Sequence, residues 1–385
     1  MGMYSLVVQP VPLRPRVRGE TLELEANLRS ARGSQFGTNV LLPDQRSVTL
    51  MLELREPRSA GLVRKIRWHT DEGVLKSDTD VLQNTFYPPI RSKVCTVEAK
   101  VGYYPRSDDR VLNIAAIEET AVLKILTPTS GDLLLNGMID GFRIGEYPNP
   151  GDPRIRETFE VDDSYALIHP DKFLRPQAFY LVDDSSRDFP LTPHLRLGAG
   201  RAHYALDYEW FSLGKRQYVA IDPGLLRKLE ALIVLFNQAG LRGDKVRTIY
   251  GFRPPVYNLE RVDRDGSDSL KAPFSLHQYG KALDIIIDAD DDLRLDDLDG
   301  DGRSTVRDAA VMMHCINQLD RRYRDEGIPL FGGAGLYDHH DFWERPVQSP
   351  YVHFDVRGFL DSTGYLIRWP RTWPDTKEPI AWGDL

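Results

Sequence analysis

The sequence predicts a multidomain, β-rich protein with an N-terminal all-β domain, a small β-subdomain and a C-terminal α+β domain. At 385 residues and 41% hydrophobic content, the chain is too long for one ordinary domain. Short alternating runs between turn residues fill the N-terminal part, as they do in β-sandwiches. A helical pattern and strand-like runs that carry histidines and aspartates follow only beyond residue 220. We therefore expect the chemistry in the C-terminal domain.

Residues 1–126 are expected to form the all-β domain. Their alternating runs are separated by proline, glycine and aspartate turns at the spacing typical of a sandwich. These runs are 21–28, 47–54, 63–69 and 94–101. Trp68 and Cys95 resemble the tryptophan and one of the two cysteines of immunoglobulin domains, so an immunoglobulin-like fold is expected. We expect a spacer or adhesion module, whose protein partner is unknown.

Two further regions follow before the C-terminal tail. Turns rich in proline, glycine and aspartate break residues 127–190 into short strands, which predicts a small β-subdomain. Residues 191–370 are expected to form the α+β domain. Within them Asp222, followed by proline, is a helix N-cap, and the apolar stripe behind it stops at Gly240. The last stretch, 371–385, is a tail rich in tryptophan and proline.

The pattern S-x-H-x-x-G-x-A-x-D predicts half of a metal site. It sets His277 and Asp284 seven residues apart, with an apolar run behind them. A neutral imidazole and an ionised carboxylate are zinc ligands, and a catalytic zinc needs only three protein ligands. The best third ligand is His353, in a run whose period-2 alternation places Tyr351, His353 and Asp355 on one strand face.

This pattern is preceded by Y-G-F-R-P-P at 250–255 and followed by V-H-F-D at 352–355. Together the motifs resemble the D-Ala-D-Ala carboxypeptidase family of zinc peptidases, which shares its fold with the Hedgehog signalling domain. The resemblance covers about the last half of the chain and implies a Hedgehog/DD-peptidase-like zinc domain. It implies that His277, Asp284 and His353 bind Zn²⁺. Arg253 would then contact the substrate near the scissile carbonyl.

The remaining expected site residues surround these ligands. Ser275 is expected to shape the ligand loop or to hold a substrate carboxylate, and Tyr351 to contact the substrate. Members of the family commonly place a glutamate or histidine just before the last ligand, where this chain has Pro350 and Tyr351. Asp355 is the nearest carboxylate and is expected to be the catalytic base. Alternatively, it orients His353 from behind.

An acidic insert at 288–308 contains a second cation motif. Its segment 297–308 has oxygen donors at loop positions 1, 3, 5, 9 and 12, a main-chain carbonyl at position 7 and glycine at position 6. The expected Ca²⁺ ligands are Asp297, Asp299, Asp301, Arg303 (through its carbonyl), Thr305 and Asp308. The final aspartate makes the segment similar to the calcium loops of dockerins. We expect a structural calcium site, the alternative being a solvated, disordered run.

Charge and hydropathy exclude several classes of function. Ten aspartates and three arginines between Asp284 and Asp308 account for most of the net charge of −8. The rest of the chain has no basic stripe, so we expect neither nucleic acid nor an anionic membrane as a partner. No apolar run approaches the length of a membrane span. No secretory signal is visible at the N-terminus.

The resemblance implies a zinc-dependent peptidase that cuts bacterial cell-wall peptides next to a D-amino acid, as a carboxypeptidase or a cross-link endopeptidase. Peptidoglycan peptides would be its partners, in the periplasm or the extracellular cell envelope. The alternative is a catalytically inactive, calcium-stabilised protein that binds the cell wall or serves in adhesion. The missing glutamate or histidine before His353 keeps this alternative open.

Overall fold

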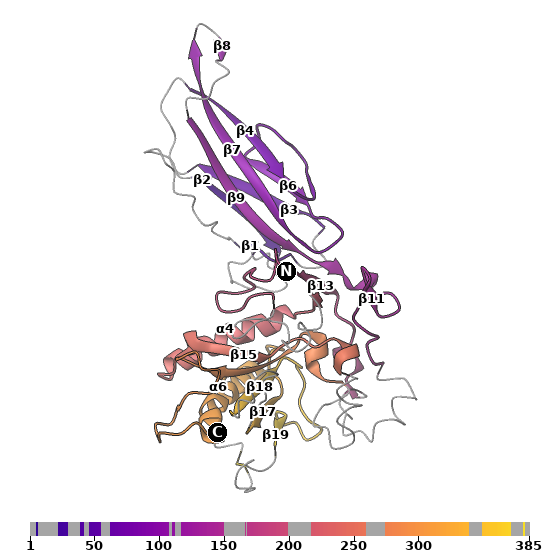
Figure 1. The fold of residues 1–385 in the computed structure, drawn as a ribbon, viewed down its shortest axis with the longest axis vertical. Helices are drawn as coiled ribbons and strands as arrows, with labels where there is room; N and C mark the ends of the chain where they lie inside the picture. The colour runs from indigo at the N-terminus through magenta and orange to yellow at the C-terminus, as the bar shows by residue number, and fades with distance from the viewer. Residues whose placement is uncertain are drawn as a thin grey trace. The chain divides into compact units, whose positions relative to one another are not determined.

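The structure is a computed structural model that describes residues 5–6, 22–29, 39–41, 46–54, 62–107, 110–111, 117–149, 166, 168–198, 217–258, 274–338, 349–370 and 380–381. These residues are mostly β-sheet with few helices, and the chain divides into two compact units, Met1–Ser130 and Gly131–Leu385 (Figure 1). The second unit contains most of the expected β-subdomain and all of the expected α+β domain. Of the expected tail, only residues 380–381 are described.

The first unit consists of two antiparallel sheets. One has the strand order β1-β2-β3-β6-β5, and in the other β7 pairs with β4, β8 and β9. The strands of these sheets are β1 (Ser5–Leu6), β2 (Leu22–Arg29), β3 (Val48–Leu54), β4 (Leu62–Thr70), β5 (Val74–Leu75), β6 (Gln83–Tyr87), β7 (Lys93–Ser107), β8 (Arg110–Val111) and β9 (Ile117–Thr127). The short strand β10 (Thr129–Ser130) belongs to neither sheet. The four alternating runs of the sequence overlap β2, β3, β4 and β7.

The two sheets of the first unit share one hydrophobic core. Alternate residues of β7, from Cys95 to Val101, are fully buried and pack in one cluster with buried residues of β3, β4, β6 and β9. This is why period-2 alternation predicted these strands. Trp68 lies in the same cluster as Cys95, and its indole Nε1–H donates to the carbonyl of Val81 at 2.8 Å.

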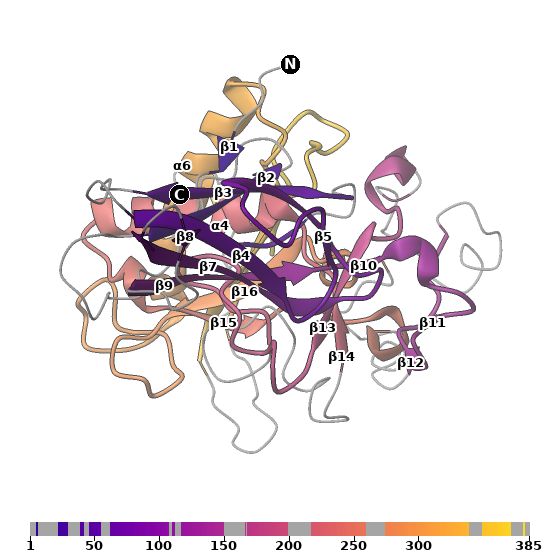
Figure 2. The same cartoon turned by 90° about the horizontal axis from the view of Figure 1, so that it is seen from above.

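The second unit contains the two long helices of the described residues, α4 (Pro223–Gln238) and α6 (Val306–Asp325). Its strands are β11 (Met138–Ile139), β12 (Phe142–Arg143), β13 (Ala178–Val182), β14 (Gln217–Val219), β15 (Val246–Tyr250), β16 (Ala282–Ile287), β17 (Ala334–Tyr337), β18 (Tyr351–Asp355) and β19 (Arg368–Trp369). Short 3₁₀ helices are η1 (Gly131–Leu133), η2 (Pro170–Lys172), η3 (Gly243–Lys245) and η5 (Leu276–Tyr279). β11 and β12 form a separate hairpin (Figure 2).

A five-stranded sheet of order β15-β16-β18-β17-β19 forms the centre of the second unit. Helix α6 packs on β17 and β18, and α4 packs on α6. Helix α4 starts where the sequence predicted, because the Asp222 carboxylate accepts the Gly224 N–H at 2.6 Å and Pro223 is the first helical residue. No helix among the described residues is long and apolar enough to cross a membrane.

Candidate metal centre

Two strands of the central sheet and the 3₁₀ helix η5 bring the expected ligands together. His277 lies in η5, Asp284 on β16 and His353 on β18, where Asp284 and His353 are direct partners in the antiparallel register. Between His277 and Asp284, Gly280 ends η5 in the left-handed conformation (φ 65°) and turns the chain into β16. A Cβ at Gly280 would lie 2.3 Å from the carbonyl oxygen of Ala220. The glycine therefore sets the spacing between His277 and Asp284.

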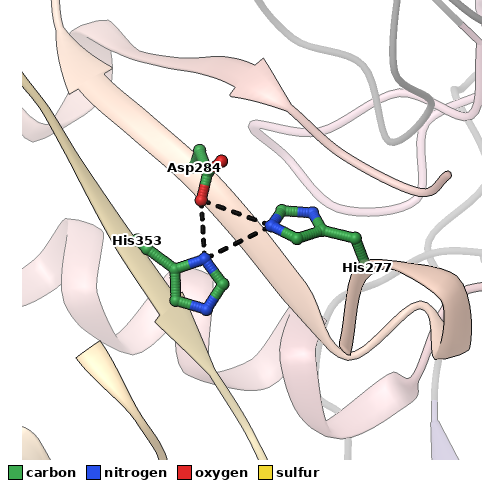
Figure 3. A group of neighbouring side chains, drawn as sticks. All are labelled: His277, Asp284 and His353. Atoms are coloured by element: carbon green, nitrogen blue, oxygen red, sulfur yellow. Dashed lines mark hydrogen bonds and ion pairs between the residues drawn. The ribbon is translucent and has the colours of Figure 1, made fainter. Parts of the chain in front are cut away.

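The three side chains converge on one point (Figure 3). His277 Nε2 lies 3.3 Å from His353 Nδ1 and 3.4 Å from Asp284 Oδ1, and His353 Nδ1 lies 2.7 Å from Asp284 Oδ1. Two ligand atoms of a tetrahedral ion such as zinc, each about 2.0–2.1 Å from it, are roughly 3.3–3.4 Å apart. The two separations from His277 Nε2 match a small tetrahedral ion, whereas the 2.7 Å between His353 Nδ1 and Asp284 Oδ1 would have to widen around one. All three residues are buried.

Contacts behind the rings decide which atoms face this point. His277 Nδ1 lies 2.7 Å from the carbonyl oxygen of Gly251, so Nδ1 carries the hydrogen and donates it. On the other ring, Nδ1 of His353 lies 2.7 Å from Asp284 Oδ1 and Nε2 lies 3.4 Å from Asp355 Oδ2, so each ring nitrogen faces a carboxylate. With the hydrogen of His353 on Nε2, the atoms that face one another are two imine nitrogens and a carboxylate oxygen, which are all acceptors. Only a cation, whether a metal ion or a proton, can hold such a group together.

The three groups shift one another's pKa values. Burial would raise the pKa of Asp284, but attraction to His277 and His353 outweighs it and holds that pKa well below its usual range. Burial lowers the pKa of His277 and keeps its ring neutral. Burial opposes the charged form of His353 too, yet the carboxylates of Asp284 and Asp355 raise the pKa of His353. The group can therefore supply one carboxylate and the neutral ring of His277 to a metal ion, which would displace a proton from His353.

Asp355 is fixed in place behind His353. It is fully buried, and Oδ1 accepts the Gly333 N–H at 2.8 Å and Arg357 Nε–H at 3.0 Å. Burial raises the pKa of Asp355, but the Arg357 guanidinium and His353 more than offset this and hold it far below its usual range. A Cβ on Gly333 would lie 2.4 Å from Arg357 Nη2. A side chain there would therefore displace the guanidinium that holds the carboxylate.

The expected substrate residues lie around the same cluster. Arg253 is 8% exposed; its backbone N–H donates to the carbonyl of His277 at 3.3 Å, and its Nη2 lies 3.4 Å from Ser275 Oγ. Tyr351 is buried and stacks on Tyr337, with ring centroids 4.6 Å apart. The structure therefore brings Arg253 and Ser275 to the helical turn of His277, and places Tyr351 on the strand of His353.

Two residues that the sequence did not single out also lie at the site. The ring of Trp369 lies 5.0 Å from that of His353, and its Nε1–H donates to the Tyr337 hydroxyl at 2.8 Å. Arg357 holds Asp355 in place. The only signal in the sequence is the pair Arg368-Trp369 at the end of the domain. The position of Trp369 beside His353 depends on the pairing of β19 with β17.

The predicted calcium loop supplies a second group of possible ligands. Carboxylate oxygens of Asp297, Asp299 and Asp308 all lie within 4.8 Å of one another. Asp308 is fully buried at the first turn of α6, where it forms a capping box with Thr305. The carboxylate of Asp301 is exposed and accepts the Arg303 N–H at 2.9 Å. The structure thus gathers three of the expected side-chain ligands at the start of α6.

Residues 288–296 repeat the local geometry of this loop. In both segments the first aspartate, Asp288 or Asp297, accepts the N–H groups of the fifth and sixth residues. The sixth residue has a positive φ in both: 69° at Leu293 and 84° at Gly302. The carboxylates of Asp288, Asp290 and Asp296 also lie within 4.8 Å of one another. The calcium motif requires glycine at the sixth position, where this segment has Leu293, so a motif search does not find the repeat. The segment also has a cationic partner in the protein itself, because Arg247 forms ion pairs with Asp288 and Asp291.

If calcium fills the loop 297–308, it should protect the thiol of Cys315 and leave that of Cys95 unaffected. Both thiols are buried and unpaired with each other; Cys315 lies on α6, which begins at the loop, and Cys95 lies in the first unit. At calcium 100 times its Kd, opening of α6 should be suppressed about 100-fold. The rate of thiol labelling in single-cysteine variants, measured against calcium concentration, checks this. A calcium-independent rate at Cys315 would contradict a structural ion in the loop.

Comparison with known proteins adds no relative to these observations. No family model, curated protein or solved structure matches the chain. The candidate function therefore depends on the arrangement of this chain's own residues, above all on three facing acceptor atoms at His277, Asp284 and His353.

Proposed function

We propose that the second unit is a zinc-dependent peptidase of the D-Ala-D-Ala carboxypeptidase type, with a Hedgehog/DD-peptidase-like fold, acting on peptidoglycan peptides. The observation that carries the proposal is the buried group of two imidazole nitrogens and a carboxylate oxygen, 2.7–3.4 Å apart, at His277, Asp284 and His353. These are three ligands of the kinds found in catalytic zinc sites, which leave one coordination position for water or substrate.

Each residue of the centre has a role in this proposal. A bound zinc ion would lower the pKa of a water molecule and polarise the peptide carbonyl. Arg253, held beside η5 by its backbone bond to His277, offers a planar fork of donors to the oxygen on which negative charge develops. Ser275 orients that fork through its hydroxyl. Tyr351, fixed by its stacking on Tyr337, forms an aromatic wall for the peptide.

Asp355 is assigned to orientation of His353 in this proposal, in preference to the role of catalytic base. A base needs an oxygen that can reach a proton of the substrate or of water. Both oxygens of Asp355 instead face Arg357, and one of them also faces His353 Nε2. The fixed carboxylate keeps the hydrogen of His353 on Nε2, so Nδ1 is available to the metal.

The substitution Asp355→Asn tests the two roles of Asp355. If it orients His353, zinc affinity should fall about 10- to 100-fold, while the fully zinc-loaded variant retains most of its turnover. Competition with a chelating dye measures the affinity, and Asp325→Asn on the exposed end of α6 is the matched control. Unchanged zinc affinity with turnover reduced about 100-fold or more would instead assign the catalytic base to Asp355.

The first unit is proposed to be an immunoglobulin-like module that holds the enzyme to the cell envelope or to a partner. Its two sheets around one core, with Trp68 and Cys95 in the same cluster, support this. Calcium in the loop 297–308 would stabilise the start of α6. Peptidoglycan peptides lie outside the cytoplasm, so the proposed site of action is the periplasm or the extracellular cell envelope.

Mass spectrometry of cell-wall peptides tests the function directly. Purified pentapeptides and cross-linked muropeptides are incubated with the protein, with a zinc chelator, and with zinc added back. Zinc-dependent release of D-Ala identifies a carboxypeptidase, and scission of cross-links identifies an endopeptidase. If the zinc-loaded protein yields no product from any of these peptides, the proposal fails in favour of a non-catalytic, calcium-stabilised binding or adhesion protein.

A further inference from the structure

Three charged side chains form a buried cluster outside the metal centre. Lys228 of α4 and Asp320 of α6 have fully buried side chains, and Arg368 of β19 has a side chain only 4% exposed. Lys228 Nζ lies 2.6 Å from Asp320 Oδ1, and Arg368 Nη2 lies 2.9 Å from Asp320 Oδ2. Each oxygen of the carboxylate thus has its own cationic partner.

This cluster is bonded to the backbone of Asp355 and to that of Gly332, in the segment that holds the Asp355 carboxylate. Lys228 Nζ donates to the main-chain carbonyl of Asp355 at 2.7 Å. Gly332 is held from both ends: its N–H donates to Asp320 Oδ1 at 3.2 Å, and its carbonyl accepts Arg368 Nη1–H at 2.8 Å. The next residue, Gly333, bonds to Asp355 through its N–H and its carbonyl. The cluster therefore fixes the two backbone segments that determine where the Asp355 carboxylate lies.

Stability alone does not explain a cluster of this kind. Removing ions from water costs several kcal/mol each, and apolar side chains of similar volume are often as stable in their place. Apolar side chains could not, however, bond to the carbonyl of Asp355 or to both ends of Gly332. The polar contacts are directed at the segments behind His353, while α4 and α6 contribute no ligand to the group of His277, Asp284 and His353.

We propose that Lys228, with Asp320 and Arg368, positions the metal centre: the cluster holds Asp355 so that its carboxylate fixes His353 for ion binding. The proposal rests on the proposed zinc site. Lys228 acts through the backbone of Asp355, which in turn contacts the outer nitrogen of His353. A shift of Asp355 would lengthen a contact that is already 3.4 Å and release the ring.

The test compares zinc affinity in Lys228→Met with that in Leu229→Ala. Methionine keeps the length and burial of Lys228 but cannot donate to Asp355, and Asp320 keeps Arg368 as its partner. Leu229, the next residue of α4, is also buried, so its truncation destabilises the same helix without touching the cluster. Affinity is measured by dye competition at a temperature where circular dichroism shows both variants folded. We expect a loss of about 10- to 100-fold in Lys228→Met and no change in Leu229→Ala.

Two further measurements keep the proposal falsifiable. Arg368→Lys retains the charge but loses the fork that reaches Gly332, and it should also weaken zinc binding, so it serves if Lys228→Met does not fold. In the double variant of Lys228→Met and Asp355→Asn, the fold-loss of zinc affinity should be smaller than the product of the two single fold-losses, because both substitutions act on His353. Parental zinc affinity in Lys228→Met or Arg368→Lys, or fully multiplicative losses, would overturn the positioning role alone. A parent protein that binds no zinc would overturn the proposed zinc site as well.

Discussion

Replacing Asp284 by alanine is expected to abolish stoichiometric zinc binding and, with it, peptidase activity. Asp284 Oδ1 lies 2.7 Å from His353 Nδ1 and 3.4 Å from His277 Nε2, so it completes the ligand group. Structural zinc sites with four protein ligands are stabilised by about 10–16 kcal/mol, or very roughly 2.5–4 kcal/mol for each ligand. Losing one ligand should therefore weaken zinc binding by about 100- to 1,000-fold, since each 1.4 kcal/mol is about tenfold.

Elemental analysis after gel filtration measures this effect without relying on turnover. The parent is expected to retain close to one zinc per chain, and Asp284→Ala to retain almost none. Asp325→Ala removes an exposed carboxylate at the end of α6 and should leave zinc occupancy unchanged. Full zinc occupancy in Asp284→Ala would mean that the ion is bound elsewhere, and the proposed centre would be wrong.

The sequence predicted the pair His277 and Asp284 because their spacing is local. His277 and Asp284 are joined by one helical turn and a glycine, and the conformation of Gly280 follows from what only glycine adopts readily. His353 was predicted from strand alternation and family resemblance. Its contact with Asp284, however, depends on the register between β16 and β18, which no local pattern fixes.

Residues that act through long-range pairing could not be predicted in the same way. Lys228 and Asp320 lie on helices whose apolar stripes dominated the sequence pattern, and a charge in such a stripe reveals its partner only after the helices pack. Arg357 lies two residues beyond Asp355, but alternation alone does not indicate that its side chain curls back to the carboxylate. Trp369 reaches His353 only because β19 adds to the sheet beside β17.

In the acidic insert, the sequence motif predicted the oxygen donors but not the hydrogen bonds that they already accept. A motif counts oxygen donors, whereas the structure also shows what those oxygens already bind. Asp308 accepts the N–H groups of Leu298 and Thr305 at 2.6 and 2.7 Å while it caps α6. Its carboxylate therefore organises the loop through backbone bonds as well as through any ion. The pattern also requires glycine at the sixth position, which is why it did not indicate the repeat at Leu293.

Removing the guanidinium of Arg253 is expected to lower kcat/KM by about 100- to 1,000-fold while zinc occupancy stays at the parental level. Arg253 contributes no atom to the ligand group, yet its backbone is bonded to His277, and the residue is only 8% exposed, with its Nη2 beside Ser275. A fixed donor in a water-poor site stabilises the charge that develops on the substrate oxygen, and loss of one such donor typically has this effect.

The series Arg253→Ala, Arg253→Lys and Arg143→Ala separates this role from general effects of charge. Arg143 is exposed on β12, so its loss should change neither kcat/KM nor zinc content. Lysine at 253 keeps the positive charge but not the planar fork, and should recover only part of the loss. Parental kcat/KM in Arg253→Ala would show that the charge on the substrate is stabilised without Arg253. A loss of zinc in that variant would instead mean that the Arg253 side chain supports the fold of η5 through Ser275, the N-cap residue of η5.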